Sequence, residues 1–357
     1  MPADRSQAFA PGRVNLIGEH TDYNQGLALP FAIAEGVTVR AEGQPPDSAG
    51  AGRVNAYAHD LDERDEFALD RPEPASGWRA FVRGSVAELA AAGFPLVGAR
   101  LEISAQLPSG AGLSSSAALE VALCLALVDL GSRGSSATAK TFRRLEIAEL
   151  CARVENDWVG AHTGLLDQLA SLYGEPDCAL LIDFRTLAVE PVPLRLGDWR
   201  LVVLDSGERH LHASSGYNER RAECARACEL LGVRSLRDAE DAAVLALPEP
   251  LRARAEHVLA ENERVRLAVA ALRADDLPTV GRLLDASHES LRERFEVSTA
   301  AVEETVERLR QAGAAGARLI GGGFGGSVLA LFAPGVQPPA QAREVRPSAG
   351  ARLLVAQ

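Results

Sequence analysis

The sequence predicts an α+β fold in two domains. Segments with helical spacing of apolar residues are mixed with short apolar or alternating runs, which favour mostly antiparallel strands rather than repeated βαβ units. The chain has 357 residues, enough for about two domains, each with its own core. We find no internal repeat of fixed period, which argues against a solenoid or a propeller.

The N-terminal half begins with a predicted strand, turn and strand over residues 8–40, with the turn at Pro11-Gly12. A segment rich in Gly, Pro and Ser at 42–53 predicts an exposed loop. The elements predicted after this loop are strands at 53–58 and 64–69, a helix at 78–92, a strand at 99–105, an apolar helix ending at Leu130, helices at 141–159 and 163–172, and a strand at 178–184.

The C-terminal half is richer in predicted helix. The elements predicted here are a strand at 201–204, helices at 212–231, 248–272, 277–293 and 299–312, and strands at 317–320, 328–332 and near 351–355.

Composition limits the classes of partner. The net charge of −12 offers no broad basic surface for nucleic acid or for an anionic membrane. The five cysteines form no CxxC pair, so buried free thiols are predicted rather than disulfides or a metal site. The first residues lack an apolar signal region, and no apolar run reaches the ~20 residues that a membrane span needs. We therefore expect a cytoplasmic protein.

Charged side chains interrupt a predicted buried strand in residues 10–24. Arg13, Glu19, His20 and Asp22 stand among residues that otherwise suit a core strand. Burial of such groups costs free energy unless they are paired or bind a ligand. Two carboxylates and an imidazole beside one strand therefore predict a surface that binds hydroxyl groups.

Two glycine-rich loops lie downstream of this segment. Residues 107–116 connect a strand to an apolar helix, so their backbone N–H groups and the helix N-terminus favour anions. No lysine follows the glycines, so this is not the GxxxxGK[ST] phosphate loop. Residues 321–326 include five glycines between two apolar strands. Taken singly, the loops have ordinary interpretations, a helix N-cap and a tight hairpin. Together they favour a nucleotide facing a small polyol.

Three further residues have plain interpretations when each is taken alone. Asp167 would be a carboxylate on the solvated face at a helix start, and Glu155 would be an ordinary surface acid. Tyr217 would be a half-buried aromatic residue.

Together these segments resemble the galactokinases of the GHMP small-molecule kinase superfamily. Three superfamily motifs occur in order at 13–24, 107–118 and 317–331, and the resemblance covers nearly the whole chain. The run Gly18-Glu-His-Thr-Asp-Tyr-Asn24 is the most specific piece, because it separates galactokinases from mevalonate and homoserine kinases. The resemblance implies a two-domain GHMP kinase fold. Residues 1–185 would form a ribosomal-protein-S5-domain-2-like domain and residues 186–357 a ferredoxin-like domain, with the active site in the cleft between them.

The resemblance also implies a role for each site residue. Asp167 would face the anomeric hydroxyl of the sugar, and Arg13 would sit between Asp167 and the γ-phosphate of ATP. Mg²⁺ would be held by Ser116 and Glu155. The residues implied in sugar binding are Glu19, His20, Thr21, Asp22, Gly164, Asp167 and Tyr217, and those implied in ATP binding are Trp78, Gly110, Ala111, Gly112, Leu113, Ser114, Ser115 and Ser116.

The implied reaction is transfer of the ATP γ-phosphate to α-D-galactose, which gives α-D-galactose 1-phosphate and ADP. Two alternatives stay open at this point. The chain could phosphorylate another sugar, such as N-acetylgalactosamine or arabinose, or it could be a galactose and ATP sensor without catalysis. The uninterrupted serine-rich loop, with Arg13 and Asp167 both present, favours the enzyme. We expect a monomer.

Overall fold

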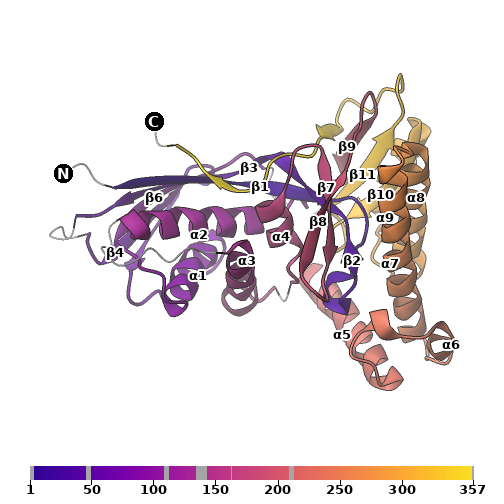
Figure 1. Cartoon of the computed structure of the whole chain (residues 1–357), viewed down its shortest axis with the longest axis horizontal. Helices are drawn as coiled ribbons and strands as arrows, with labels where there is room; N and C mark the ends of the chain where they lie inside the picture. The colour runs from indigo at the N-terminus through magenta and orange to yellow at the C-terminus, as the bar shows by residue number, and fades with distance from the viewer. Residues whose placement is uncertain are drawn as a thin grey trace.

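The computed structural model describes residues 4–45, 50–107, 112–133, 143–161, 163–208 and 213–355. Within these ranges it confirms the predicted α+β class (Figure 1). Strand pairing is antiparallel except between β4 (Arg53–Ala58) and β6 (Ala99–Ala105). Two hydrophobic clusters form the core, a larger one under the first sheet and a smaller one in the C-terminal half.

The larger cluster lies between a six-stranded sheet and four helices. The strand order is β13-β1-β3-β6-β4-β5, and the helices pack on one face of the sheet, as Figure 1 shows. Besides β4 and β6, the elements are β1 (Arg5–Asn15), β3 (Pro30–Gly43), β5 (Glu63–Ala68), β13 (Arg352–Leu353), α1 (Trp78–Ala91), α2 (Ser115–Arg133), α3 (Arg144–Arg153) and α4 (Leu166–Tyr173).

The smaller cluster lies between a four-stranded antiparallel sheet and a helical layer. The strand order is β10-β11-β9-β12. The elements are β9 (Arg200–Asp205), β10 (Ala314–Ile320), β11 (Ser327–Phe332), β12 (Arg343–Val345), α5 (Ala213–Leu231), α6 (Asp241–Val244), α7 (Leu251–Arg273), α8 (Leu277–Glu293) and α9 (Ala300–Gln311), with a 3₁₀ turn at Leu236–Asp238.

A three-stranded sheet joins the two halves. It consists of β2 (Leu27–Ala28), β7 (Cys178–Asp183) and β8 (Ala188–Pro193). Residue 185 falls between β7 and β8, where we predict the domain boundary. The chain nevertheless returns across this boundary at its C-terminal end, because β13 pairs with Ala8 and Phe9 of β1.

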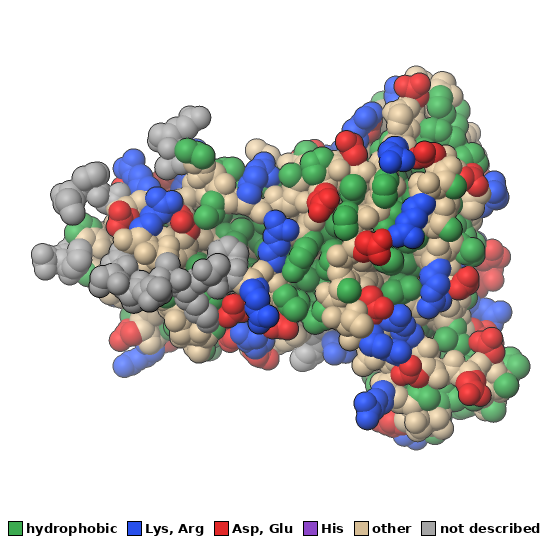
Figure 2. Space-filling view, in the orientation of Figure 1, with side chains coloured by type: hydrophobic (Ala, Val, Ile, Leu, Met, Phe, Trp, Pro, Cys, Tyr) green, Lys and Arg blue, Asp and Glu red, His purple; other side chains and the backbone are tan. Residues whose placement is uncertain are grey.

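Helix α2 forms the centre of the larger cluster. Among the described helices it alone is long and apolar enough to cross a membrane, but 78% of that apolar window is buried inside the protein, as in a core helix. Figure 2 shows acidic and basic side chains interspersed over the face in view rather than a broad region of one sign. All five cysteines are free thiols, as predicted, but only Cys124, Cys151 and Cys224 are buried, whereas Cys178 and Cys228 are partly exposed.

The predicted turn at Pro11-Gly12 is wrong. Strand β1 continues through both residues: Pro11 pairs with Gly36 of β3 and Arg13 with Ala32, so the extra residues at this register shift belong to β3. This irregularity is a β-bulge, which adds a local twist without ending the strand. A turn signal in sequence and a bulge in a long strand share the same residue types.

The predicted helix at 141–159 is interrupted. Its first two residues lie outside the described ranges, α3 ends at Arg153, and residues Val154–Val159 form a π-helix. Such single wide turns are often found at functional sites. Here the π-helix carries Glu155, which is buried rather than the surface acid that its sequence context alone suggests.

A glycine lies next to the bulge of β3, where the two strands approach closely. Gly36 of β3 lies opposite Pro11, and a Cβ placed on Gly36 would lie 2.1 Å from the carbonyl oxygen of Ala10. We expect Gly36→Ala to lower the free energy of unfolding by about 1–3 kcal/mol, because the backbone must shift to admit the methyl group.

Thermal unfolding followed by circular dichroism measures this effect as a lower midpoint temperature. The matched control is Gly52→Ala, because a Cβ at Gly52 meets no atom within 4 Å. Equal midpoints for the two variants would contradict the interpretation of Gly36.

Candidate active site

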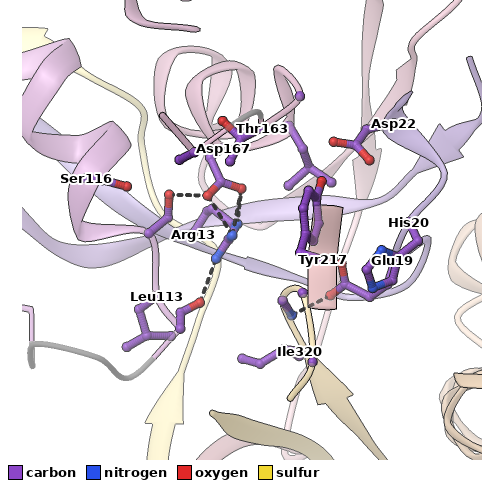
Figure 3. Close-up of a pocket in the computed structure, with 18 of the residues that line it drawn as sticks. Arg13, Glu19, His20, Asp22, Leu113, Ser116, Thr163, Asp167, Tyr217 and Ile320 are labelled. Carbon is purple, nitrogen blue, oxygen red and sulfur yellow. Dashed lines mark hydrogen bonds and ion pairs between the residues drawn. The ribbon is translucent and has the colours of Figure 1, made fainter. Parts of the chain in front are cut away.

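A cavity of about 410 Å³ brings residues of all three predicted motifs together (Figure 3). One side is formed by the loop after β1, another by the serine-rich loop at the start of α2, and a third by the second glycine-rich loop. The lining residues are Arg13, Glu19, His20, Asp22, Gly112, Leu113, Ser114, Ser115, Ser116, Ala161, Thr163, Gly164, Leu166, Asp167, Tyr217, Ile320, Gly321, Gly322 and Gly323.

Arg13 and Asp167 form a bidentate ion pair in the cavity. Arg13 Nε and Nη2 donate to Asp167 Oδ1 and Oδ2, both at 2.7 Å. Ser114 Oγ donates to the same Oδ2 at 2.6 Å, and Arg13 Nη1 donates to the Gly112 carbonyl at 2.7 Å. The pair therefore fixes β1, α4 and the serine-rich loop relative to one another. Figure 3 shows the bonds that join Arg13 to Asp167.

The loop after β1 presents Glu19, His20 and Asp22 to the cavity. It turns sharply, because Gly18 and His20 both have positive φ (101° and 61°) and Asp22–Asn24 form a 3₁₀ turn. The Thr21 hydroxyl closes the loop by donating to the carbonyls of Gly18 and Leu27, at 3.0 and 2.8 Å. Thr21 is fully buried and does not line the cavity, so its direct contact with a ligand stays a prediction.

His20 is a neutral imidazole. Burial, together with the neighbouring His257, lowers its pKa to about 3. Nδ1 lies 2.9 Å from the Tyr23 hydroxyl, while the ring packs against Phe295 and Tyr217 with centroid distances of 4.6 and 5.4 Å. These contacts fix the position of the ring, and its Nδ1 is occupied by the Tyr23 hydroxyl.

Asp22 lies in an unfavourable environment for a charge. Burial, together with the nearby carboxylates of Asp167 and Glu19, raises its pKa to about 6. Gly164 lies directly against it, since a Cβ there would be 2.0 Å from Asp22 Oδ2. A larger residue at 164 would therefore displace this carboxylate. Burial also raises the pKa of Tyr217 well above its ordinary value, so its hydroxyl stays protonated and can donate.

Three residues of α7 support the loop from behind. The Gly18 N–H donates to Glu261 Oε1 at 2.9 Å, the Leu27 N–H donates to Asn262 Oδ1 at 2.7 Å, and His257 Nε2 lies 3.2 Å from the Glu19 carbonyl. Burial raises the pKa of Glu261, but Arg264 and further cationic and hydrogen-bonding neighbours outweigh it, so the net value is about 2. Sequence reasoning missed these residues. The available signal was three polar residues on the buried face of a predicted helix.

Glu155 faces the serine-rich loop from the π-helix. Its Oε2 accepts from Thr163 Oγ1 and, at 3.0 Å, from Gln168 Nε2. Burial raises its pKa and the negative charge of Asp167 adds to this, whereas hydrogen bonds from Thr163, Ser116 and Gln168 oppose the rise. Thr163 and Gln168 are supporting residues that sequence reasoning did not assign.

Some predicted site residues lie elsewhere. Trp78 is on α1 and does not line the cavity; its indole N–H donates to Glu63 Oε2 at 2.7 Å, and its contact with adenine stays a prediction. Gly110 and Ala111 lie outside the described residues. In the second glycine-rich loop, Gly322 packs against the Tyr217 ring and the Gly321 N–H donates to Glu19 Oε1 at 2.8 Å. This loop therefore closes the side of the cavity that contains Glu19.

Three protein-family models match the chain. They are the galactokinase galactose-binding signature at residues 3–42, the GHMP kinases N-terminal domain at 80–175 and the GHMP kinases C-terminal domain at 268–352. The first match contains the loop with Glu19, His20 and Asp22. The second contains the serine-rich loop, Glu155 and Asp167.

Relatives and solved structures agree with these matches. A galactokinase of Mycobacterium tuberculosis is 46% identical over 94% of this chain and 90% of its own, and one of Thermotoga petrophila is 39% identical over 91% and 89%. The crystal structure of Lactococcus lactis galactokinase complexed with galactose has a TM-score of 0.86 and 32% identity over 98% of this chain and 95% of that chain. The Methanococcus jannaschii mevalonate kinase, at 17% identity and a TM-score of 0.68, shares the fold. The chain therefore belongs to the galactokinase family of GHMP kinases.

Proposed function

We propose that this chain is a galactokinase, which transfers the γ-phosphoryl group of ATP to the anomeric hydroxyl of α-D-galactose. The observation that carries the proposal is the Arg13–Asp167 pair, which lies in one cavity with the carboxylates of the Gly18–Asn24 segment and with the serine-rich loop. Neither another sugar nor a sensor without catalysis is favoured, since the curated relatives named above are galactokinases and the residues assigned to catalysis are present.

The sugar would bind between Glu19, His20, Asp22, Gly164 and Tyr217. These residues offer carboxylate acceptors, a neutral imidazole and a phenol, which together match a ring of hydroxyl groups. A pocket built to pair with hydroxyls rejects analogues that leave its polar groups unpaired, by up to about 10⁴–10⁵-fold. Sugar selectivity is therefore expected to rest on this loop.

The phosphates of ATP would bind at residues 110–116. Backbone N–H groups at the start of α2 and the hydroxyls of Ser115 and Ser116 suit an anion, and the helix dipole adds to the attraction. Arg13 lies between this loop and Asp167, where its fixed guanidinium can stabilise charge that develops on the transferred group.

Ser116 and Glu155 suit Mg²⁺. No cluster of three or more His, Cys, Asp or Glu side chains that could hold a metal occurs among the described residues. Mg²⁺ nevertheless commonly binds through one or two protein oxygens together with phosphates and water. Glu155 supplies a buried carboxylate whose pKa is raised by burial and by the charge of Asp167, and Ser116 hydrogen-bonds to it. When bound, the ion would neutralise phosphate charge.

Asp167 would orient the anomeric hydroxyl and accept its proton. Both of its oxygens already accept hydrogen bonds from Arg13 and Ser114, which fix the orientation of the carboxylate. Phosphoryl transfer has a loose transition state in which positioning matters more than deprotonation. We therefore expect the proton to move late.

The enzyme is proposed to act as a monomer in the cytoplasm. The free cysteines suit a reducing compartment, which is also where ATP is abundant.

The proposed function predicts fast ADP release with galactose and slow release with other sugars. A coupled assay with Mg-ATP would compare galactose with glucose, talose, galactosamine, N-acetylgalactosamine and arabinose, and phosphorus NMR would locate the phosphate on the product. EDTA should abolish turnover. Preferred turnover of another sugar, or a phosphate at another position, would contradict the proposal.

Asp167→Asn should lower kcat by about 10²–10⁴-fold, because it removes the proton acceptor while keeping the shape of the side chain. Galactose affinity, measured by calorimetry, should change far less. Ser114→Ala is the matched control, since it removes one hydrogen bond to Asp167 but leaves the Arg13 pair intact. Turnover of Asp167→Asn close to that of the native enzyme would rule out this role.

Galactose affinity should fall with pH below about 6, because the sugar hydroxyls donate to ionised Asp22 and protonation removes this acceptor. The affinity should be constant above pH ~7 and weaken by about tenfold per unit at pH well below 6. Calorimetry in buffers of different ionisation enthalpy should show proton release on galactose binding near pH 6. Asp22→Asn should abolish that release, and an unchanged release in this variant would assign it to another group.

A further inference from the structure

Arg318 is a fully buried cation that the catalytic scheme leaves without a role. It lies on β10, with no solvent-exposed surface. Its Nη1 donates to the carbonyls of Asn15 and Leu16, at 2.9 and 3.0 Å, where β1 runs into the Gly18–Asn24 loop. Its Nη2 lies 3.0 Å from Glu19 Oε1. A single side chain from the C-terminal half thus contacts three points of the N-terminal motif.

Two groups converge on one oxygen of Glu19. Oε1 accepts from the Gly321 N–H at 2.8 Å and pairs with Arg318, and both partners come from the segment that contains the second glycine-rich loop. Among the described residues, the contacts of this carboxylate are concentrated on Oε1. Oε2 is the oxygen left to accept from a ligand in the cavity that Glu19 lines.

Glu19 is the carboxylate with which Arg318 forms its ion pair, because the other buried carboxylate nearby has partners of its own. Glu261, the other buried carboxylate in this region, is satisfied by Arg264 Nε at 2.6 Å, Ser287 Oγ at 2.7 Å and the Gly18 N–H. His257 is held neutral, because burial lowers its pKa to about 4. Loss of Arg318 would therefore leave Glu19 as a buried carboxylate without a cation in contact, which is costly and favours displacement of the side chain.

We propose that Arg318 is a positioning residue for sugar binding, which holds Glu19 by one oxygen so that the other faces the galactose hydroxyls. The proposal rests on the proposed function for the identity of the sugar. Arg318 does not line the cavity and would touch neither substrate. Its effect on the sugar would pass through Glu19, and among the described residues it has no hydrogen bond or ion pair with Arg13, Asp167 or the serine-rich loop. Its loss should therefore affect galactose and spare ATP.

The test measures galactose binding by calorimetry and steady-state kinetics in Arg318→Met and Arg318→Lys. We expect Arg318→Met to raise the Kd and KM for galactose by about 10- to 100-fold. This is the range for losing the hydrogen bond between a sugar hydroxyl and the charged Glu19 carboxylate. The KM for ATP, and kcat at saturating galactose, should stay within about threefold. Arg318→Lys keeps the charge and should recover part of the galactose affinity.

A double-mutant cycle with Glu19→Gln separates positioning from general damage. If Arg318 acts through Glu19, adding Arg318→Met to Glu19→Gln should weaken galactose binding by less than about twofold further. The matched control is Arg83→Met, which also loses an ion pair with a buried carboxylate, Asp65, and a bond to a carbonyl, but lies outside the cavity. This control should lower the unfolding temperature without changing either KM.

Three results would overturn the proposal: unchanged galactose affinity in folded Arg318→Lys and Arg318→Met, equal rises in both KM values, or additive effects in the cycle. If Arg318→Met does not fold, Arg318→Lys and the double variant, which buries no unpaired charge, decide the matter. The native protein distinguishes the two hypotheses. Failure of the native chain to bind galactose would refute the proposed function, whereas native binding that is insensitive to Arg318 would refute only this inference.

Discussion

The ion pair between Arg13 and Asp167 is the constraint on which the cavity depends. It joins residues 154 positions apart in the chain, one on β1 and one on α4, through two charge-assisted hydrogen bonds. Removal of either partner would leave the other charge partly buried and unpaired. Because Ser114 and the Gly112 carbonyl join the same pair, the serine-rich loop takes its position from it as well.

Around this pair the cavity has two sides that are supported differently. The proposed sugar-binding side is braced by α7 and β10. Glu261 bonds to Gly18 in the loop, and Asn262 and Arg318 bond to Leu27 and Asn15, which flank it. The proposed phosphate-binding side relies on the start of α2, on the π-helix and on the hydrogen bonds that Glu155 accepts from Thr163 and Gln168. Rigid support on the sugar side suits selection among hydroxyl arrangements, which differ only in the position of single polar groups.

The sequence predicted the site better than it predicted what supports the site. Charged residues that interrupt an apolar run are a local signal, so Arg13, Glu19 and Asp22 could be identified before the structure was known, whereas Asp167 was identified only through the resemblance to galactokinases. Their supports come from residues far away in sequence. Arg318 contacts Asn15 from 303 positions away, and Glu261 contacts Gly18 from 243. Such pairings depend on tertiary packing, which no local pattern contains.

The sequence prediction of local structure was wrong where the same residue types occur in two different backbone conformations. Pro11 and Gly12 are typical of a turn, yet the long pairing of β1 with β3 holds them in a strand opposite the bulge of β3. The π-helix at Val154–Val159 has the same apolar spacing as an ordinary helix end, so sequence predicted a continuous helix and an exposed Glu155. In both cases tertiary contacts outweighed local preference.

The return of the chain to β1 has a consequence for biosynthesis. Strand β13 pairs with Ala8 and Phe9, the Leu354 N–H donates to the Gln7 carbonyl, and the Ser348 N–H donates to the Ala32 carbonyl. On the ribosome, β1 emerges early while its partner β13 is still untranslated, so one edge of the six-stranded sheet must wait with its backbone groups unpaired. Exposed strand edges invite association with other chains. This edge of the sheet therefore stays open to association with other chains until the segment around β13 has left the exit tunnel.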